Sequence, residues 1–216
     1  SFARCGFTGN LTLPMGLTNI QSSAFYNTKF KGELNIPSTV TTIGSSAFYR
    51  NEFNGTLILP KELISLGSGA FSGCWRLSGV VEIPENIVAI PSSLFSGCKN
   101  IEGIVLHKDV EVIESQAFAN CFYVSSIVSK AKNAPTIASN SFNGVAKDNF
   151  VVEVPEASVK QYQNAAYWRA LAADYPDISI YIENMFDQDP EPMVALMREL
   201  KDVPGVSACL DFAHAS

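Results

Sequence analysis

The chain repeats one pattern of apolar and polar positions at a nearly constant interval. An aliphatic residue stands five positions before a phenylalanine in each full repeat, another stands eight positions before it, and the residue just before it is usually alanine. The phenylalanines that mark the period are Phe2, Phe25, Phe48, Phe71, Phe95, Phe118 and Phe142. A period of this kind predicts a solenoid, because one unit cannot bury its own apolar face whereas stacked units can. We therefore expect the phenylalanines to form an aromatic spine within a continuous core.

A short stretch of alternating apolar residues precedes a proline in most repeats. The alternating pairs are Leu11 and Leu13, Leu34 and Ile36, Leu57 and Leu59, and Val81 and Ile83. Such alternation predicts a short strand with one buried face. Each strand is expected to pair in parallel with the next and to end at the proline, which has no N–H to donate: Pro14, Pro37, Pro60 or Pro84. His107 takes the proline position in the following repeat, where we expect it to be a turn residue.

The repeat resembles the leucine-rich repeat of bacterial surface antigens, called BspA-like. Residues 34–53, LNIPSTVTTIGSSAFYRNEF, follow its pattern closely, and the resemblance covers about residues 1–168. The repeat 127–145 departs most, since Lys130 and Ala131 replace the Ile-Pro pair. The resemblance implies a leucine-rich repeat solenoid of short parallel strands, turns and short helical segments. It also implies a secreted or cell-surface bacterial protein with an adhesion-type role.

Three regions are expected along the chain. Residues 1–154 form the solenoid, which begins in mid-repeat at Phe2 and so suggests further repeats before it. Residues 155–175 form a C-terminal capping helix, with Tyr162 and Trp168 covering the last repeat; a sugar-binding role for Trp168 is the alternative. Residues 176–216 form a small βαβ-like tail.

The tail resembles a fragment of a sugar isomerase or epimerase TIM barrel. A strand pattern at 178–186, an amphipathic helix at 190–202 and a second strand pattern from 206 follow one another. In that family the strand ends carry a metal-binding pattern that Glu183, Asp211 and His214 match. The match covers about 40 residues, far short of the roughly 250 of a barrel. We therefore read the pattern as vestigial and expect no metal or other cofactor and no catalysis by this chain.

Composition narrows the classes of partner. The net charge is −6 and the pI is near 4.9, without a basic run, which argues against nucleic acid or an anionic membrane. No apolar run is long enough to cross a bilayer, and no signal peptide is present in these residues. Four of the five cysteines share the position three after the phenylalanine: Cys5, Cys74, Cys98 and Cys121. A metal or disulfide ladder would need converging ligands or facing side chains, so we expect buried small residues that hydrogen-bond to nearby backbone.

Two functions from different classes remain. The first is a non-catalytic binding or adhesion module, whose sheet face contacts a protein or glycan ligand on a host or neighbouring cell. The second is a fragment of a metal-dependent sugar isomerase fused to repeats. For the binding module, the candidate ligand-binding residues lie between the alternating apolar residues that we expect to be buried, and they are expected to point outward: Thr12, Asn35, Ile58, Glu82 and Val105. Ile58 and Val105 are apolar where polar residues would be tolerated, which indicates a contact surface. Nothing in the sequence fixes the oligomeric state.

Overall fold

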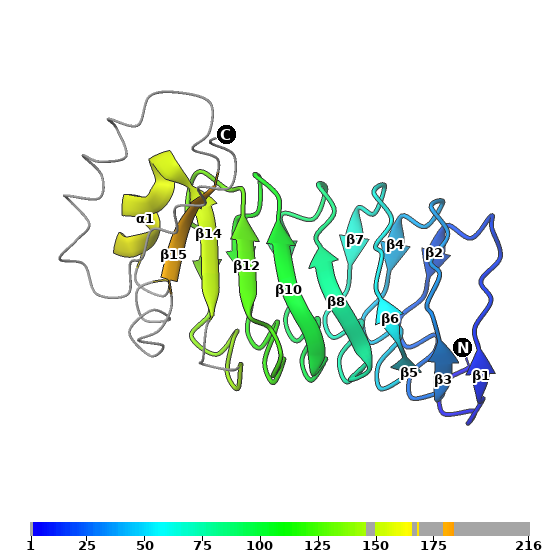
Figure 1. Cartoon of the computed structure of the whole chain (residues 1–216). Helices are drawn as coiled ribbons and strands as arrows, with labels where there is room; N and C mark the ends of the chain where they lie inside the picture. The colour runs from blue at the N-terminus through cyan, green and yellow to red at the C-terminus, as the bar shows by residue number, and fades with distance from the viewer. Residues whose placement is uncertain (1, 146–149, 166–167, 169–178, 184–216) are drawn as a thin grey trace, which may run out of the picture.

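The computed structural model describes residues 2–145, 150–165 and 168, and the backbone of 179–183. Figure 1 shows a solenoid whose successive turns of chain stack along one axis, with the N-terminal turn at one end and the helix α1 at the other. All paired strands are parallel, and they form four sheets. The expectation of a parallel leucine-rich repeat solenoid is confirmed.

The turns of the solenoid contribute strands to one side, where β10 is the longest with seven residues. These strands are β1 (Gly9–Asn10), β3 (Phe30–Gly32), β5 (Glu52–Phe53), β6 (Gly55–Thr56), β8 (Leu77–Glu82), β10 (Asn100–Leu106), β12 (Ser126–Ser129), β14 (Val151–Pro155) and β15 (Ser179–Glu183). They form a three-stranded sheet in the order β1-β3-β5 and a six-stranded sheet in the order β15-β14-β12-β10-β8-β6.

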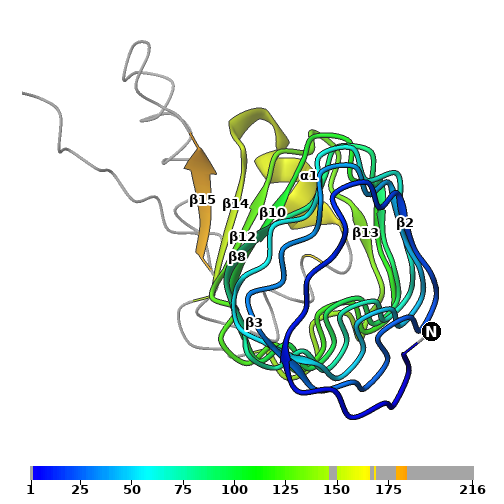
Figure 2. The ribbon, with the colours of Figure 1, turned by 90° about the vertical axis from the view of Figure 1, so that its right-hand side faces the viewer.

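A second column of two-residue strands lies on the opposite side of the solenoid, as the end-on view of Figure 2 shows for β2 and β13. Its members are β2 (Asn19–Ile20), β4 (Thr42–Ile43), β7 (Ser65–Leu66), β9 (Ala89–Ile90), β11 (Val112–Ile113) and β13 (Thr136–Ile137). Each ends on the aliphatic residue five before the phenylalanine, and all of these aliphatic side chains are buried. The sequence pattern predicted their burial but not this second set of strands.

The phenylalanine column forms the expected spine. Neighbouring rings from Phe2 to Phe142 stack with centroids 5.3 to 6.0 Å apart and planes within 16° of parallel. The four central rings are fully buried: Phe48, Phe71, Phe95 and Phe118. A second, shorter column of rings, formed by Phe7, Phe30 and Phe53, stacks beside the first.

The C-terminal end of the solenoid is covered by a short helical segment, η1 (Glu156–Ser158) followed by α1 (Val159–Asn164). The buried Tyr162 hydroxyl donates to the carbonyl of Ala131 (3.0 Å) and lies 2.7 Å from the Ser129 hydroxyl. Trp168 packs on Tyr162 with ring centroids 5.0 Å apart, and its indole N–H donates to the carbonyl of Pro135 at 2.7 Å. Both aromatic residues therefore cover the last repeat, as the sequence predicted.

The strand expected at the start of the tail is present as β15, and it pairs with β14 from Val151↔Ser179 to Pro155↔Glu183. It thus adds one strand to the repeat sheet. The boundary at 176 stays a prediction, because residues 184–216 lie outside the described part of the chain. Glu183 is described only by its backbone, and Asp211 and His214 not at all, so their metal-binding pattern is not placed.

Candidate ligand-binding face

The five residues predicted to form a ligand-binding stripe follow one another across successive repeats. Thr12, Asn35, Ile58 and Glu82 are exposed, and Ile58 leaves 76% of its surface open to solvent. Val105 is half-buried in β10, where it pairs opposite Glu82 of β8. The outward direction predicted from the alternation is confirmed for the first four residues and holds in part for Val105.

Three surface grooves run along this face, between neighbouring repeats within residues 11–86. The first lies between Thr12 and Asn35, the second between Asn35 and Ile58, and the third between Ile58 and Glu82, with volumes of about 360, 690 and 810 Å³. Consecutive grooves share wall residues, so together they form one continuous face. Val105 lines none of the three. The structure thus brings four of the five stripe residues to one hollowed surface, here called the groove face.

The grooves open where the backbone ladder stops. Pairing between β6 and β8 ends at Thr56↔Ser78, before the extended segment 57–60 begins. In the described part of the chain, the backbones of Ile58 and Leu59 make no hydrogen bond. The ladder in the later repeats continues further, because Lys130 donates its N–H to the carbonyl of Leu106 at 3.0 Å. Proline ends the corresponding segments in the earlier repeats and offers no N–H for such a bond.

This observation corrects one expectation from the sequence. The alternating segments around Leu11–Leu13, Leu34–Ile36 and Leu57–Leu59 bury their apolar alternates as predicted, or nearly so, but they are not ladder strands. The paired residues lie just before them, in β1, β3, β5 and β6. The alternation therefore located the buried side chains correctly and the hydrogen bonding incorrectly.

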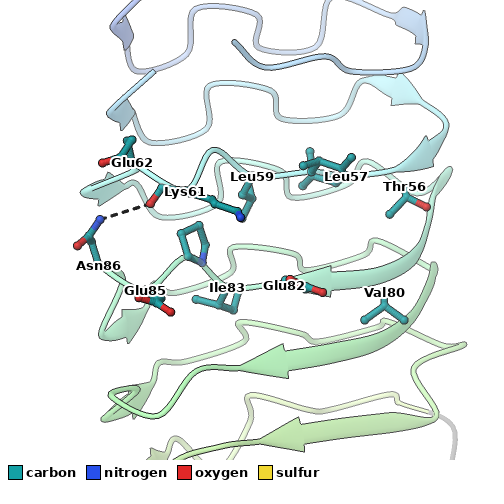
Figure 3. Close-up of a pocket in the computed structure, with 12 residues that line it drawn as sticks. Thr56, Leu57, Leu59, Lys61, Glu62, Val80, Glu82, Ile83, Glu85 and Asn86 are labelled. Atoms are coloured by element: carbon teal, nitrogen blue, oxygen red, sulfur yellow. Dashed lines mark hydrogen bonds between the residues drawn. The ribbon is translucent and has the colours of Figure 1, made fainter. Parts of the chain in front are cut away.

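The third groove combines apolar and charged groups. Figure 3 shows its two walls, residues 56–62 from one repeat and 80–86 from the next. Ile58 and Val80 present exposed apolar surface, while Lys61, Glu62 and Glu82 present charges. One hydrogen bond closes the groove at its far end, from the Asn86 side-chain amide to the carbonyl of Lys61 at 3.4 Å. Such a surface offers apolar contact, charge and free backbone donors and acceptors to a ligand.

Three of the four cysteines in the shared position have the buried structural role that the sequence predicted, whereas Cys5 is exposed. The thiols of Cys74, Cys98 and Cys121 are buried, and each donates a hydrogen bond of 3.1 Å to the phenylalanine carbonyl of the preceding repeat. Burial raises the pKa of Cys74 and of Cys121 to about 12, and burial together with the neighbouring thiols raises the pKa of Cys98. Asn51 fills the same position and bonds to the same kind of carbonyl, that of Phe25, at 2.6 Å. A thiol held in this way is a poor nucleophile and a poor metal ligand.

His107 is a buried turn residue, as predicted. Its Nδ1 accepts the backbone N–H of Asp109 at 3.2 Å, and its Nε2 lies 3.1 Å from the carbonyl of Ile87. One ring nitrogen therefore holds the turn, and the other contacts the preceding repeat. Within the described ranges, no three His, Cys, Asp or Glu residues are grouped so as to hold a metal ion.

One surface feature did not emerge from the local reading of the sequence. Trp75, Phe122 and Tyr123 are exposed at the turns that follow the phenylalanine column. The residues around Trp75 differ from those around Phe122 and Tyr123, so no short sequence motif marks these three positions. Counting positions from the phenylalanine of each repeat would have placed them on one edge.

Comparison with known proteins identifies the repeat. The family model for the BspA type leucine-rich repeat region matches residues 1–125 and 52–170, with six copies. No curated protein matches the chain.

Two solved structures are similar to the chain. A leucine-rich repeat protein from Bacteroides ovatus ATCC 8483 matches with a TM-score of 0.50 and 17% identity, over 71% of this chain and 51% of that one. A leucine rich cell surface protein from Faecalibacterium prausnitzii A2-165 matches with a TM-score of 0.39 and 16% identity, over 77% of this chain and 60% of that one. The chain thus spans between half and two thirds of these two proteins, and the first likeness supports the fold. On the strength of the family match, this chain belongs to the BspA-type leucine-rich repeat family.

Proposed function

We propose that the chain is a non-catalytic binding module of a secreted or cell-surface protein, and that the groove face binds its ligand. The observation that carries this proposal is the arrangement of Thr12, Asn35, Ile58 and Glu82 along three grooves that share their walls. Family membership supports a repeat-based surface module, and the cell-surface description belongs to one of the similar proteins. Within the described residues, no helix has the length and apolar character needed to span a bilayer.

The chemistry of the groove face favours a protein ligand with an extended segment. Extended chains bind through main-chain hydrogen bonds when they meet unpaired backbone groups, and pockets for their side chains add specificity. The unbonded backbone at Ile58 and Leu59 supplies such groups. The exposed apolar surface of Ile58 and Val80, with Lys61 and Glu82 nearby, has the apolar centre and charged surround of a protein interface.

The experiment compares the full chain with a groove variant, Ile58→Lys with Glu82→Lys, against a panel of purified extracellular-matrix proteins immobilised on a sensor. We expect saturable binding to at least one panel member and a loss of about tenfold or more in the variant, because a lysine in the apolar centre must be desolvated and a charge is reversed.

A matched control makes the same chemical changes elsewhere. Ile64 is 63% exposed and Glu111 is also exposed, and neither lines the grooves. The variant Ile64→Lys with Glu111→Lys should bind like the unaltered chain. If the groove variant binds every panel ligand as tightly as this control does, the groove face is not the binding site.

A further inference from the structure

Positive charge is concentrated on one edge of the solenoid, at positions two to six after the spine phenylalanines from Phe2 to Phe118. These positions hold one carboxylate, Glu52, and six cations: Arg4, Lys29, Lys31, Arg50, Arg76 and Lys99. Glu52 lies 3.7 Å from the Lys31 ammonium and 4.0 Å from the Arg76 guanidinium, so one carboxylate is shared between two of the cations. The edge therefore has a formal charge of +5 in a chain whose net charge is −6. We call it the basic turn edge. Such segregation indicates an anionic partner.

Exposed aromatic rings lie on the same edge. Trp75 and Phe122 occupy the fourth position after the phenylalanine and are 45% and 42% exposed, and Lys99 occupies that position in the repeat between them. The Lys99 ammonium lies 5.6 Å from the Phe122 ring centroid, and the Arg76 guanidinium lies 5.2 Å from that of Trp75. Tyr123, next to Phe122, is 65% exposed. A cation thus lies between two rings over these three repeats, whereas Glu52 occupies the same position in the repeat before Trp75.

In the N-terminal repeats, cations of the edge lie over tyrosines that directly follow the spine phenylalanines. Tyr26 and Tyr49 stack with centroids 4.6 Å apart. Arg4 lies over Tyr26 at 5.6 Å and Arg50 lies over Tyr49 at 5.1 Å. These cation–π contacts hold the guanidinium groups on the ring faces, where their N–H groups remain available to a ligand.

Arg4 and Arg50 have a left-handed backbone conformation, which favours glycine or asparagine. The second residue after the phenylalanine is left-handed in every repeat, and Gly73, Gly97, Asn27 and Asn120 fill it elsewhere. Arg50 has φ of 54° there, a conformation that is unfavourable for a residue with a side chain. A Cβ added to Gly73 would lie 2.8 Å from Cγ of Arg50, so this glycine leaves room for the arginine side chain. The turn itself does not require arginine, which favours a role in binding.

We propose that the basic turn edge binds an anionic polysaccharide that runs along the solenoid axis. The exposed faces of Trp75, Phe122 and Tyr123 would contact the C–H faces of sugar rings, and Arg50, Arg76 and Lys99 would bind carboxylate or sulfate groups. Neighbouring repeats are spaced by about 4.8 Å, so the edge offers a periodic row of rings and cations. A polymer of repeating charged sugars matches that periodicity better than the irregular surface of a folded protein does. This site is distinct from the groove face and does not depend on it.

The test uses the full chain and three labelled polysaccharides, chondroitin sulfate, hyaluronan and polygalacturonate, with neutral dextran for comparison. Fluorescence anisotropy should show binding of at least one anionic polysaccharide but not of dextran, and the binding should weaken as salt is raised. Trp75→Ala and Lys99→Ala should each weaken it about tenfold or more. Lys132→Ala, which removes an exposed cation outside the edge, should leave it unchanged.

Three results would overturn the proposal. The first is no binding to any of the anionic polysaccharides. The second is equally tight binding of polyglutamate or a single-stranded DNA oligonucleotide, which would mean that charge alone or stacked bases are recognised. The third is binding that is insensitive to Trp75→Ala in a variant whose circular dichroism is unchanged. The groove variant Ile58→Lys with Glu82→Lys should retain polysaccharide binding, so failure at one site is distinguishable from failure at the other.

Discussion

The rings of Phe71 and Phe95, which occupy the same position in successive repeats, stack with centroids 5.6 Å apart and planes within 9° of parallel. Both side chains are fully buried. This contact repeats from one turn of the solenoid to the next, so each spine residue stabilises the two repeats beside it. The stability of the solenoid should therefore be largely the sum of nearest-neighbour contacts.

Phe95→Ala should destabilise the chain by about 3–5 kcal/mol, because it removes a fully buried ring and leaves a cavity. Urea melts followed by circular dichroism would measure the loss. Phe122→Ala is the matched control, since Phe122 is 42% exposed and should cost much less. The damage should centre on residues 56–126. Equal loss of amide-exchange protection at residues 20–40 and 90–110 would contradict the nearest-neighbour picture.

The buried cysteines make the chain sensitive to alkaline pH. Burial raises the pKa of Cys74 and Cys121 to about 12, whereas an unfolded thiol titrates near 8.5. Below the pKa of the unfolded thiol, protonation of these thiols does not weaken the folded state. As pH rises from that pKa toward the pKa of the folded thiol, the folded state loses stability, because only the unfolded chain releases the thiol protons in this range. Each such thiol should lower the free energy of unfolding by about 1.4 kcal/mol per pH unit across this window.

The measurement is urea unfolding between pH 8 and 9.5, below the range near pH 10 in which Tyr162 of the unfolded chain releases its proton; in the folded chain burial raises the pKa of Tyr162 to about 12. Cys74→Ser with Cys121→Ser should make the pH dependence less steep, because serine does not titrate and only Cys98 of the three buried thiols remains. Equal slopes in the variant and the unaltered chain would show that these thiols are not protonated and buried as described.

The capping segment can be tested through one hydroxyl. Tyr162→Phe removes the bond to the Ala131 carbonyl and leaves the nearby Ser129 hydroxyl without its partner. We expect a loss of about 1–3 kcal/mol, because these groups are buried. Tyr123→Phe alters an exposed hydroxyl and should have no measurable effect. If both variants melt at the same urea concentration, the cap does not depend on this contact.

The boundary predicted at residue 176 can be tested by truncation. A chain ending at Asp174 lacks β15, which pairs with β14 along its whole length. It should still unfold cooperatively, because the capping contacts of Tyr162 and Trp168 remain. Loss of cooperative unfolding would mean that residues 175–216 are part of the repeat fold.

Much of the fold could be predicted from the sequence, because the period is carried by residues that must be buried. The spacing of the phenylalanines located the spine, and the shared position of Cys74, Cys98 and Cys121 indicated one structural role. The short strands such as Thr42–Ile43 could not be predicted, since two residues are too few to show an alternation. The segments around Leu34 and Leu57 have alternating apolar residues but no ladder of backbone hydrogen bonds to the next repeat. Burial of side chains and pairing of backbone are separate requirements.

The candidate site was predictable in its residues but not in its shape. The alternation indicated that Thr12, Asn35, Ile58 and Glu82 point outward. The grooves between them depend on where pairing between repeats ends, which is a relation between chain segments that belong to different repeats. The basic turn edge was missed for a similar reason, because its residues come from six turns and form a surface only when the repeats are stacked.

The most direct test of the proposed function is amide hydrogen exchange of the full chain with and without a ligand identified from the matrix-protein panel. In the free chain, the amides of Ile58 and Leu59 should exchange quickly because they are not hydrogen-bonded, while that of Lys130 should be protected. On binding, we predict new protection at residues 56–62 and 80–86, which form the walls of the third groove. Protection confined to other parts of the chain, with the exchange of Ile58 and Leu59 unchanged, would contradict the assignment of the groove face as the ligand-binding surface.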